Sequence, residues 1–269
     1  MQKFIEHRIG DKRLVRLLMK WLHAGVLEDG ELRAVEEGTP QGGIIRPLLA
    51  NISLHYAFDL WANAWRKRHA RGAVYIVRYA DDLVRGFQYE KDARAMHEAL
   101  ASRFAKFGLE LHPDKTRVLQ FGRFARQDAE REGRPRPETF DFLGFTHIAG
   151  VSRRGAFQLN RRTSRKKRNA KLASLRDEMR ERRHESVRAQ HAWLTSVLRG
   201  HDQYDGVPTN SRALQQFRER VRAGWHRQLQ RRSQRAEWTR SQREEFDRRF
   251  PLPPSRIHHP WPSLPQAGS

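Results

Sequence analysis

The sequence predicts an α+β protein, in which a sheet with packing helices is followed by an all-helical, strongly basic region. Residues 73–79 and 83–88 are rich in β-branched and aromatic residues, as is typical of paired strands. From about residue 161 onward, apolar residues recur at helical spacing. The excess of basic residues is concentrated in this same region, so periodicity and charge divide the chain in a similar way.

The charge of the chain points to a polyanionic partner. The 269 residues have a formal net charge of +22. Residues 151–269 contain 28 basic and 11 acidic side chains and hold +17 of this charge, whereas residues 1–150 hold only +5. Nucleic acid is the partner that such a balance favours, and its binding should depend strongly on salt.

Several classes of protein are excluded by composition. The chain has no cysteine, which excludes disulfides, thiol catalysis and zinc sites built on cysteine, and is typical of a reducing compartment. No run of about 18 apolar residues predicts a membrane span. The charged N-terminus does not resemble a signal peptide, so we expect a cytoplasmic protein.

Helices are expected on both sides of a glycine-rich loop near the N-terminus. Apolar spacing predicts a first helix, whose apolar face is formed by Leu14, Leu17, Leu18, Trp21 and Leu22. The loop at residues 38–43 contains three glycines. Pro47 suits the first turn of the next helix, which is continued by Leu48, Leu49, Ile52, Tyr56 and Leu60.

The sequence Tyr79-Ala80-Asp81-Asp82 joins the two predicted strands in a tight hairpin with two carboxylates at its tip. The apolar residues before it predict a buried sheet, at whose edge unpaired acids are costly unless a cation offsets them. Paired carboxylates can hold Mg²⁺ for phosphoryl transfer. An ordinary exposed turn is the alternative interpretation of an Asp-Asp pair by itself.

The chain between the hairpin and the basic region alternates in character. A helix is expected over residues 93–107, because its apolar positions are in phase and Gly108 follows. Residues 118–121 resemble a strand, and residues 123–138 a polar, flexible excursion. A short strand at residues 140–145 is expected to continue through a further hairpin to about residue 159.

Three helices and a proline-rich tail are expected in the basic region. Leu172, Leu175 and Met179 form the apolar side of the first helix. A second helix is expected over residues 190–198 and a third over residues 211–230. The apolar positions of this third helix are Leu214, Phe217, Val221 and Trp225.

Four motifs resemble, in order, those of group II intron-encoded reverse transcriptases of the maturase type. They are Gly38 to Ile52, Tyr79 to Asp82, Gly108 to Thr116, and Phe140 to Phe145. The resemblance continues through Trp193-Leu194, Leu198 to His201 and Asn210 to Leu214, and therefore covers nearly the whole chain.

The resemblance implies a domain organisation and a function. It implies a partial reverse transcriptase palm at residues 1–160, a helical thumb or maturase domain at 161–250, and an irregular proline-rich tail at 251–269. The implied function is RNA-directed DNA polymerase and intron maturase, which binds intron RNA, template–primer and dNTPs. Two Mg²⁺ ions are expected in a complete site.

The resemblance also assigns roles to residues near the hairpin. Asp81 and Asp82 are the implied catalytic residues and Mg²⁺ ligands. Lys115 matches a catalytic lysine near the triphosphate. The implied contacts with the nascent base pair and the incoming nucleotide come from Gln41, Gly42, Tyr79 and Ala80.

Further roles fall in the later motifs. Phe142, Leu143 and Gly144 match a hairpin that grips the primer. The first helix of the implied thumb is expected to follow an RNA phosphate backbone. The cations expected to do so are Arg165, Lys166, Lys167, Arg168 and Lys171.

The sequence departs from the family in one respect that affects activity. Family members carry a third catalytic carboxylate and a fingers region, which are expected upstream of Met1. We therefore expect impaired polymerase activity from this chain alone, with a complementing fingers fragment or a homodimer left open. The alternative is a non-catalytic RNA-binding maturase remnant that assists splicing. A palm-type nucleotide cyclase is disfavoured, because no Gly-Gly-Asp/Glu-Glu-Phe turn is present.

Overall fold

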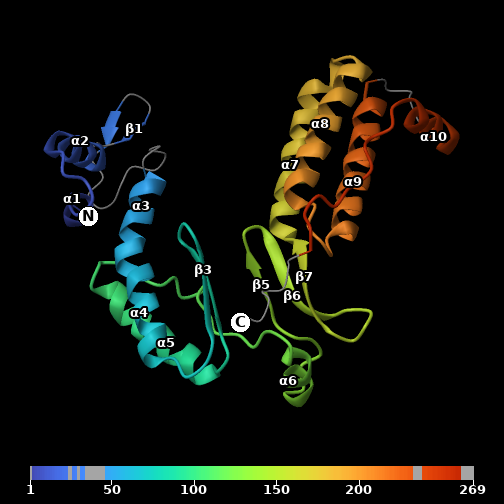
Figure 1. The fold of residues 1–269 in the computed structure, drawn as a ribbon. Coiled ribbons are helices and arrows are strands. Elements are labelled where there is room, and N and C mark those ends of the chain that lie inside the picture. The colour runs from blue at the N-terminus through green and yellow to red at the C-terminus, as the bar shows by residue number, and fades with distance from the viewer. Residues whose placement is uncertain (1, 24–25, 29–30, 34–45, 233–237, 262–269) are drawn as a thin grey trace. The chain divides into compact units, whose positions relative to one another are not determined.

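The computed structural model describes residues 2–23, 26–28, 31–33, 46–232 and 238–261. The chain forms two compact units, Met1–Val118 and Leu119–Ser269 (Figure 1). Hydrophobic cores form separately within the two units. This division rests on packing alone, and the palm and thumb boundaries near residue 160 stay a prediction.

The first unit consists of helices around one strand pair, with a small second pair near the N-terminus. Strands β1 and β2 are antiparallel, as the Asp29-Gly30 sequence between them predicts. The elements are α1 (Gln2–Glu6), α2 (Lys12–His23), β1 (Val26–Glu28), β2 (Glu31–Arg33), α3 (Arg46–Leu54), the π-helix η1 (His55–Asp59), α4 (Leu60–His69), β3 (Val74–Tyr79), β4 (Asp82–Phe87) and α5 (Glu90–Ala105).

Helices form over the segments of the first unit that the sequence predicts to be helical, although α5 begins at Glu90 and not at residue 93. In the part of α2 whose side chains are described, Val15 and Leu18 are buried and pack with Ile5 of α1, whereas Leu14 and Leu17 are exposed. Leu48 is also exposed, and Leu49 is the buried residue of α3. The predicted apolar face of α2 is therefore confirmed at Leu18 and wrong at Leu14 and Leu17, whereas α3 continues through Leu48 and Leu49 as predicted.

Helices α3, η1 and α4 follow one another directly, and α5 packs against the π-helical segment. Phe58 of η1 is fully buried and packs with Met96 and Leu100 of α5, which confirms the predicted apolar face of that helix. The carboxylate of Asp92 accepts hydrogen bonds from the backbone N–H groups of Arg71 and Gly72. This contact fixes the chain where it enters β3.

The second unit combines a three-stranded antiparallel sheet, in the order β5-β6-β7, with a helical bundle. Two predictions for the chain before the sheet are wrong. Residues 118–121 are not a strand, and a helix forms within the predicted excursion, with Ala125 and Ala129 buried. The elements are α6 (Ala125–Arg131), β5 (Thr139–Phe142), β6 (Phe145–Val151), β7 (Phe157–Thr163), α7 (Arg165–Glu181), the 3₁₀ turn η2 (Arg182–His184), α8 (Val187–Asp205), α9 (Ser211–Gln230) and α10 (Arg240–Arg249).

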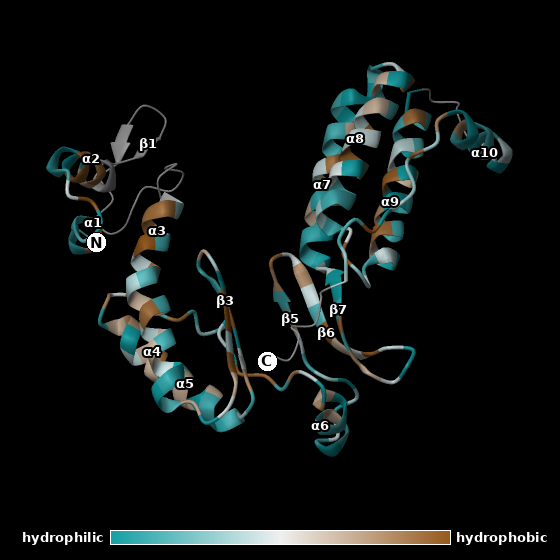
Figure 2. Ribbon diagram, viewed as in Figure 1, coloured by the Kyte–Doolittle hydropathy of each residue, from teal (hydrophilic) through white to brown (hydrophobic). Residues whose placement is uncertain are grey.

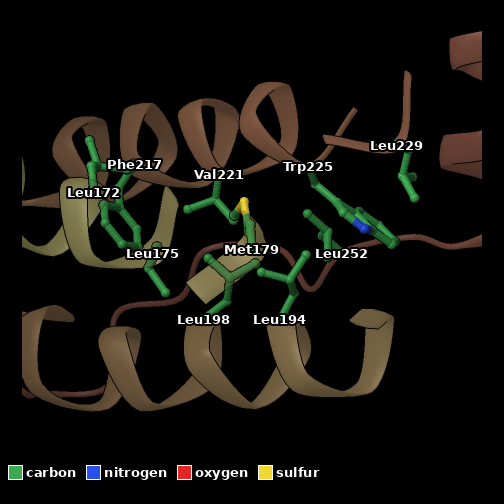
Figure 3. Close-up of a cluster of buried hydrophobic side chains, with 10 residues drawn as sticks. All are labelled: Leu172, Leu175, Met179, Leu194, Leu198, Phe217, Val221, Trp225, Leu229 and Leu252. Carbon is green, nitrogen blue, oxygen red and sulfur yellow. The ribbon is translucent and has the colours of Figure 1, made fainter. Parts of the chain in front are cut away.

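The bundle core contains the residues that the helical periodicity predicts. Trp225 of α9 is buried among leucines of α8, and its indole N–H donates to Gln190 Oε1 at 2.8 Å. The hydrophobic residues are a minority in α7 and α9, whose other positions are hydrophilic (Figure 2). The cluster consists of Leu172, Leu175, Met179, Leu194, Leu198, Phe217, Val221, Trp225, Leu229 and Leu252 (Figure 3).

The proline-rich segment after α10 has no regular secondary structure up to residue 261, but it packs onto the bundle. Leu252 is buried in the core, and Arg218 donates hydrogen bonds to the backbone carbonyls of Leu252 and Pro253. The backbone N–H groups of His258 and His259 both donate to the carbonyl of Gly206. Within the described residues, no helix is long and apolar enough to cross a membrane.

Candidate active site

The two predicted acids lie at the tip of a two-residue hairpin. Strands β3 and β4 are antiparallel, with Tyr79 opposite Asp82, so Ala80 and Asp81 form the turn. The φ angle of Ala80 is 52°, a conformation that costs an L-residue about 1 kcal/mol. Asp81 and Asp82 are both exposed. The tight hairpin with carboxylates at its tip is therefore confirmed.

Arg78 holds this turn from the strand that precedes it. Its guanidinium donates to both carboxylate oxygens of Asp59, with Nε–Oδ1 and Nη2–Oδ2 distances of 2.8 and 2.7 Å. Its Nη1 also donates to Asn51 Oδ1 at 2.6 Å and to the Ala80 carbonyl at 3.1 Å. One partly buried side chain thereby connects the backbone of the turn to two helical segments.

The ion pair with Asp59 favours the charged form of Arg78. The hydrogen bond to Asp59 and the charge of that carboxylate raise the pKa of Arg78, although burial opposes the shift. Asp59 ends the π-helical segment η1, and such π-turns are frequent at functional positions. The sequence analysis missed Asp59 and Asn51; the available signal was an acid between the apolar residues Phe58 and Leu60.

The two faces of the hairpin have different surroundings. Ile76 packs on the helical core together with Leu83 and Phe87. On the opposite face, Tyr75, Val77 and Tyr79 are 69%, 52% and 65% exposed. The prediction of a wholly buried sheet is therefore wrong, because alternate side chains of a strand point to opposite faces and only one face is covered. Tyr79 and its neighbours form an open apolar surface beside the acids.

The remaining residues assigned near the nucleotide are Gln41, Gly42 and Lys115. Gln41 and Gly42 lie outside the described residues. Lys115 is exposed in a turn, where its backbone N–H donates to the carbonyl of His112. Ala80 and Tyr79 are the two that lie beside Asp81 and Asp82.

The chemistry of the turn suits a hard divalent cation. Adjacent carboxylates offer oxygen ligands, and Mg²⁺ typically takes one or two carboxylates together with waters and phosphate oxygens. Within the described ranges, no group of three His, Asp or Glu residues is placed to hold a metal. Asp81 and Asp82 therefore fit part of a Mg²⁺ site that leaves room for a phosphate ligand.

A second tight hairpin turn lies in the other unit. Phe142 pairs with Phe145, and the two turn residues between them, Leu143 and Gly144, have φ angles of 49° and 77°. The backbone N–H of Ser164 donates to the Gly144 carbonyl at 2.9 Å. The predicted primer-grip residues thus lie at one turn, whose Gly144 carbonyl is held by the residue that precedes helix α7.

The cations of α7 do not share one environment. Arg165, Lys166 and Lys171 are exposed, as a phosphate-binding role requires. Lys167 instead forms an ion pair with Asp205, with an Nζ–Oδ1 distance of 3.0 Å. Arg168 is partly buried, and this desolvation lowers its pKa, with smaller contributions from nearby arginines. The five residues are therefore not equally available to an RNA backbone.

The comparison with known proteins concerns the part of the chain that contains both turns. Residues 2–147 match the family model described as reverse transcriptase (RNA-dependent DNA polymerase). "Protein YkfC" of Escherichia coli (strain K12) is 32% identical over 149 residues, which cover 44% of this chain and 38% of that protein. The group II intron-encoded protein LtrA of Lactococcus lactis is 49% identical over 51 residues, 19% of this chain and 8% of LtrA.

A further similar protein comes from yeast. The "Uncharacterized 91 kDa protein in cob intron" of Schizosaccharomyces pombe is 34% identical over 70 residues, which cover 26% of this chain and 9% of that protein. The chain thus spans less than two-fifths of the length of each of these relatives.

Proposed function

Because this chain belongs to the reverse transcriptase (RNA-dependent DNA polymerase) family, in its group II intron-encoded branch, we propose that it supplies palm and thumb functions for RNA-directed DNA synthesis and intron maturation. The observation that carries the proposal is the hairpin tip, where Asp81 and Asp82 are exposed on a turn held by Arg78. The substrates are dNTPs and a template–primer, and intron RNA is the second nucleic-acid partner.

Asp81 and Asp82 hold Mg²⁺ in this proposal. The bound cation would neutralise charge on the triphosphate and on the attacking hydroxyl during nucleotidyl transfer. The two carboxylates accept this cation from a turn whose backbone is fixed by Arg78, so little reorganisation is needed. Tyr79 offers its exposed ring beside them to a base or sugar of the primer end.

Other residues supply positioning and charge. Gln41 and Gly42 approach the nascent base pair, because glycine lets the backbone come close to a ligand. Lys115 neutralises the triphosphate or protonates the leaving group. In the second unit, Phe142, Leu143 and Gly144 contact the primer, and the exposed cations Arg165, Lys166 and Lys171 bind RNA phosphates.

Metal-directed cleavage tests the proposed site without depending on polymerase turnover. Fe²⁺ with ascorbate and peroxide should cut the chain near residues 79–82, and excess Mg²⁺ should suppress the cut. The double variant Asp81→Asn/Asp82→Asn should lose this cut. The matched control Asp177→Asn, which changes an exposed acid on α7, should keep it. Cleavage that is unchanged in the double variant would contradict the proposal.

Non-catalytic RNA binding is the second candidate, and the +17 charge of residues 151–269 favours it. Here the chain would assist intron folding without DNA synthesis. Binding to structured RNA should then weaken steeply as salt rises, and should be the same in the Asp81→Asn/Asp82→Asn variant. Primer extension that appears in the original chain and disappears in the variant would favour the polymerase over this alternative.

A further inference from the structure

The Leu143–Gly144 turn is enclosed by side chains of α7 and α8. The hydroxyl of Tyr204 donates to the Leu143 carbonyl at 3.2 Å, and the Tyr204 ring stacks on Phe145 with a centroid distance of 5.9 Å. The stem of Lys167 lies so close to Gly144 that an added Cβ would be 2.8 Å from its Cδ. The turn therefore adopts its positive φ angles against a surface made by these two side chains.

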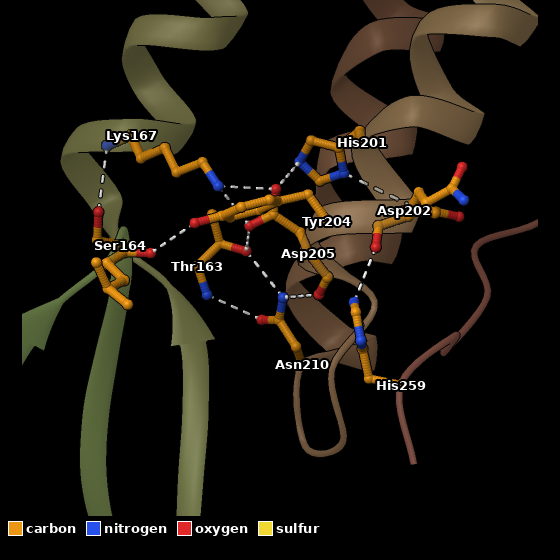
Figure 4. Close-up of polar contacts among 11 residues, drawn as sticks. Thr163, Ser164, Lys167, His201, Asp202, Tyr204, Asp205, Asn210 and His259 are labelled. Carbon is orange, nitrogen blue, oxygen red and sulfur yellow. Dashed lines mark hydrogen bonds and ion pairs between the residues drawn. The ribbon is translucent and has the colours of Figure 1, made fainter. Parts of the chain in front are cut away.

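The ammonium group of Lys167 is committed to this location. It lies 3.0 and 3.1 Å from the two carboxylate oxygens of Asp205, and 3.8 Å from the centroid of the Tyr204 ring (Figure 4). The side chain of Asp205 is only 3% exposed. A move of Lys167 toward a phosphate would leave this buried carboxylate without its cation, which is unfavourable.

The carboxylate of Asp205 is in turn fixed by a buried polar network. It accepts a hydrogen bond from Thr163 Oγ1 at 3.1 Å, and His201 Nε2 lies 3.6 Å from its other oxygen. Asn210 bridges the same region, since its Nδ2 donates to Thr163 Oγ1 at 2.8 Å and to the Asp205 carbonyl at 2.7 Å (Figure 4). The partner of Lys167 is thus immobile.

We propose that Lys167 and Tyr204 are positioning residues for the Leu143–Gly144 turn, and that Asp205 fixes Lys167 for this purpose. Lys167 consequently differs from Arg165, Lys166 and Lys171, which remain available to RNA. The importance of the positioned turn for the primer rests on the proposed function. The hydrogen bonds and packing that hold the turn do not depend on the proposed function.

The test uses the full chain and the matched variants Lys167→Met and Lys171→Met, which remove an engaged and an exposed ammonium from the same helix. Hydrogen–deuterium exchange of peptides covering residues 139–147 reports on the turn. Tyr204→Phe removes the hydrogen bond to the Leu143 carbonyl and should speed this exchange about fivefold. Lys167→Met removes the ion pair that fixes the stem against Gly144 and should also speed it. Lys171→Met should leave it unchanged.

Salt dependence of RNA binding gives the opposite pattern. Lys171→Met should lower the slope of log K against log salt by about one, because one phosphate contact is lost, and Lys167→Met should not. The double variant Lys167→Met/Asp205→Asn leaves no unpaired buried acid and keeps the test valid if Lys167→Met does not fold. It should show the same fast exchange and unchanged slope.

A fluorescent base at the primer 3′ end links the turn to the reaction. Its signal should change in Lys167→Met and in Tyr204→Phe while the affinity for the duplex stays constant. Unchanged exchange at residues 139–147, or a salt slope in Lys167→Met that falls as far as in Lys171→Met, would overturn the positioning role. Altered exchange together with an unchanged primer-end signal would overturn the link to the primer, and so count against the proposed function alone.

Discussion

The two hairpin turns of this chain are equally short but have opposite surroundings. Both are two-residue turns with a non-glycine residue at positive φ, 52° at Ala80 and 49° at Leu143. The first is held at one carbonyl by Arg78 of its own strand, and its acids stay exposed. The second is held at two carbonyls by residues of the following helices or their N-terminal boundary, Ser164 and Tyr204.

The difference shows how two hairpin turns of the same length can serve two purposes. A turn that is held by an arginine of its own strand keeps its acidic side chains free for a cation or a nucleotide. A turn that is enclosed from several sides becomes a fixed surface, whose position depends on distant parts of the sequence. We therefore expect substitutions in the polar network of Asp205 and Asn210 behind the second turn to cost the most stability, because this network is buried and cooperative.

Asn210→Ala should have the largest effect. The Asn210 side chain is fully buried and makes three hydrogen bonds: to the Thr163 N–H, to Thr163 Oγ1 and to the Asp205 carbonyl. Its loss leaves buried partners unpaired, and the free energy of unfolding should fall by about 3 kcal/mol. Urea unfolding with hydrogen exchange read on peptides of α8 and α9 measures this. The exposed Asn169→Ala serves as control, and a loss of similar size there would show that the network is unimportant.

Arg78→Ala should have the next largest effect on stability, and this effect should concern the first turn. The variant removes the paired hydrogen bonds to Asp59 and the contacts to Asn51 and Ala80, so the first unit should lose about 2 kcal/mol of unfolding free energy. Arg94→Ala removes an exposed pair with Glu90 and should change stability by less than about 0.5 kcal/mol.

The same urea experiment, read on peptides of β3 and β4, measures the effect. Equal stability of the Arg78→Ala and Arg94→Ala variants would mean that the first turn does not depend on the arginine. It would also remove the contrast between a turn held by an arginine of its own strand and a turn held by residues from later in the chain.

Part of this contrast could be predicted from the sequence. The Tyr79–Asp82 hairpin and the apolar faces of α5, α7 and α9 are local patterns, and each is confirmed. The supports of both turns could not be predicted, because they join residues far apart in the chain. Arg78 and Asp59 are 19 positions apart, and Tyr204 and Leu143 are 61 apart.

The errors have local causes. Helix α6 was not predicted, because its segment is polar in composition and its two buried alanines give only a weak apolar signal. The exposed face of β3 was missed because its tyrosines and valine look identical to core residues when their surroundings are unknown. Lys167 resembled its exposed neighbours for the same reason.

Ala80→Gly should have a smaller effect that tests whether the first turn is strained. Glycine adopts positive φ without a steric cost, so unfolding free energy should rise by about 0.5 kcal/mol. The same substitution at Ala101, an exposed position of helix α5, should lower it by about 1 kcal/mol. Urea unfolding read on the first unit compares the two, and a loss of stability in both variants would argue against strain at Ala80.

A pH-dependent effect should be confined to the sheet that carries the second turn. His147 stacks on Phe140, and burial lowers its pKa below the ordinary value; Arg161 also lowers it, whereas Phe145 and Asp141 oppose the shift. The folded state then binds fewer protons than the unfolded state below about pH 6.5, so stability should fall as the pH drops through this value. His147→Gln should weaken this dependence, and the exposed His184→Gln should not. A stability profile of the second unit that is flat from pH 7 to 5 in the original chain would rule out His147 as a titrating element.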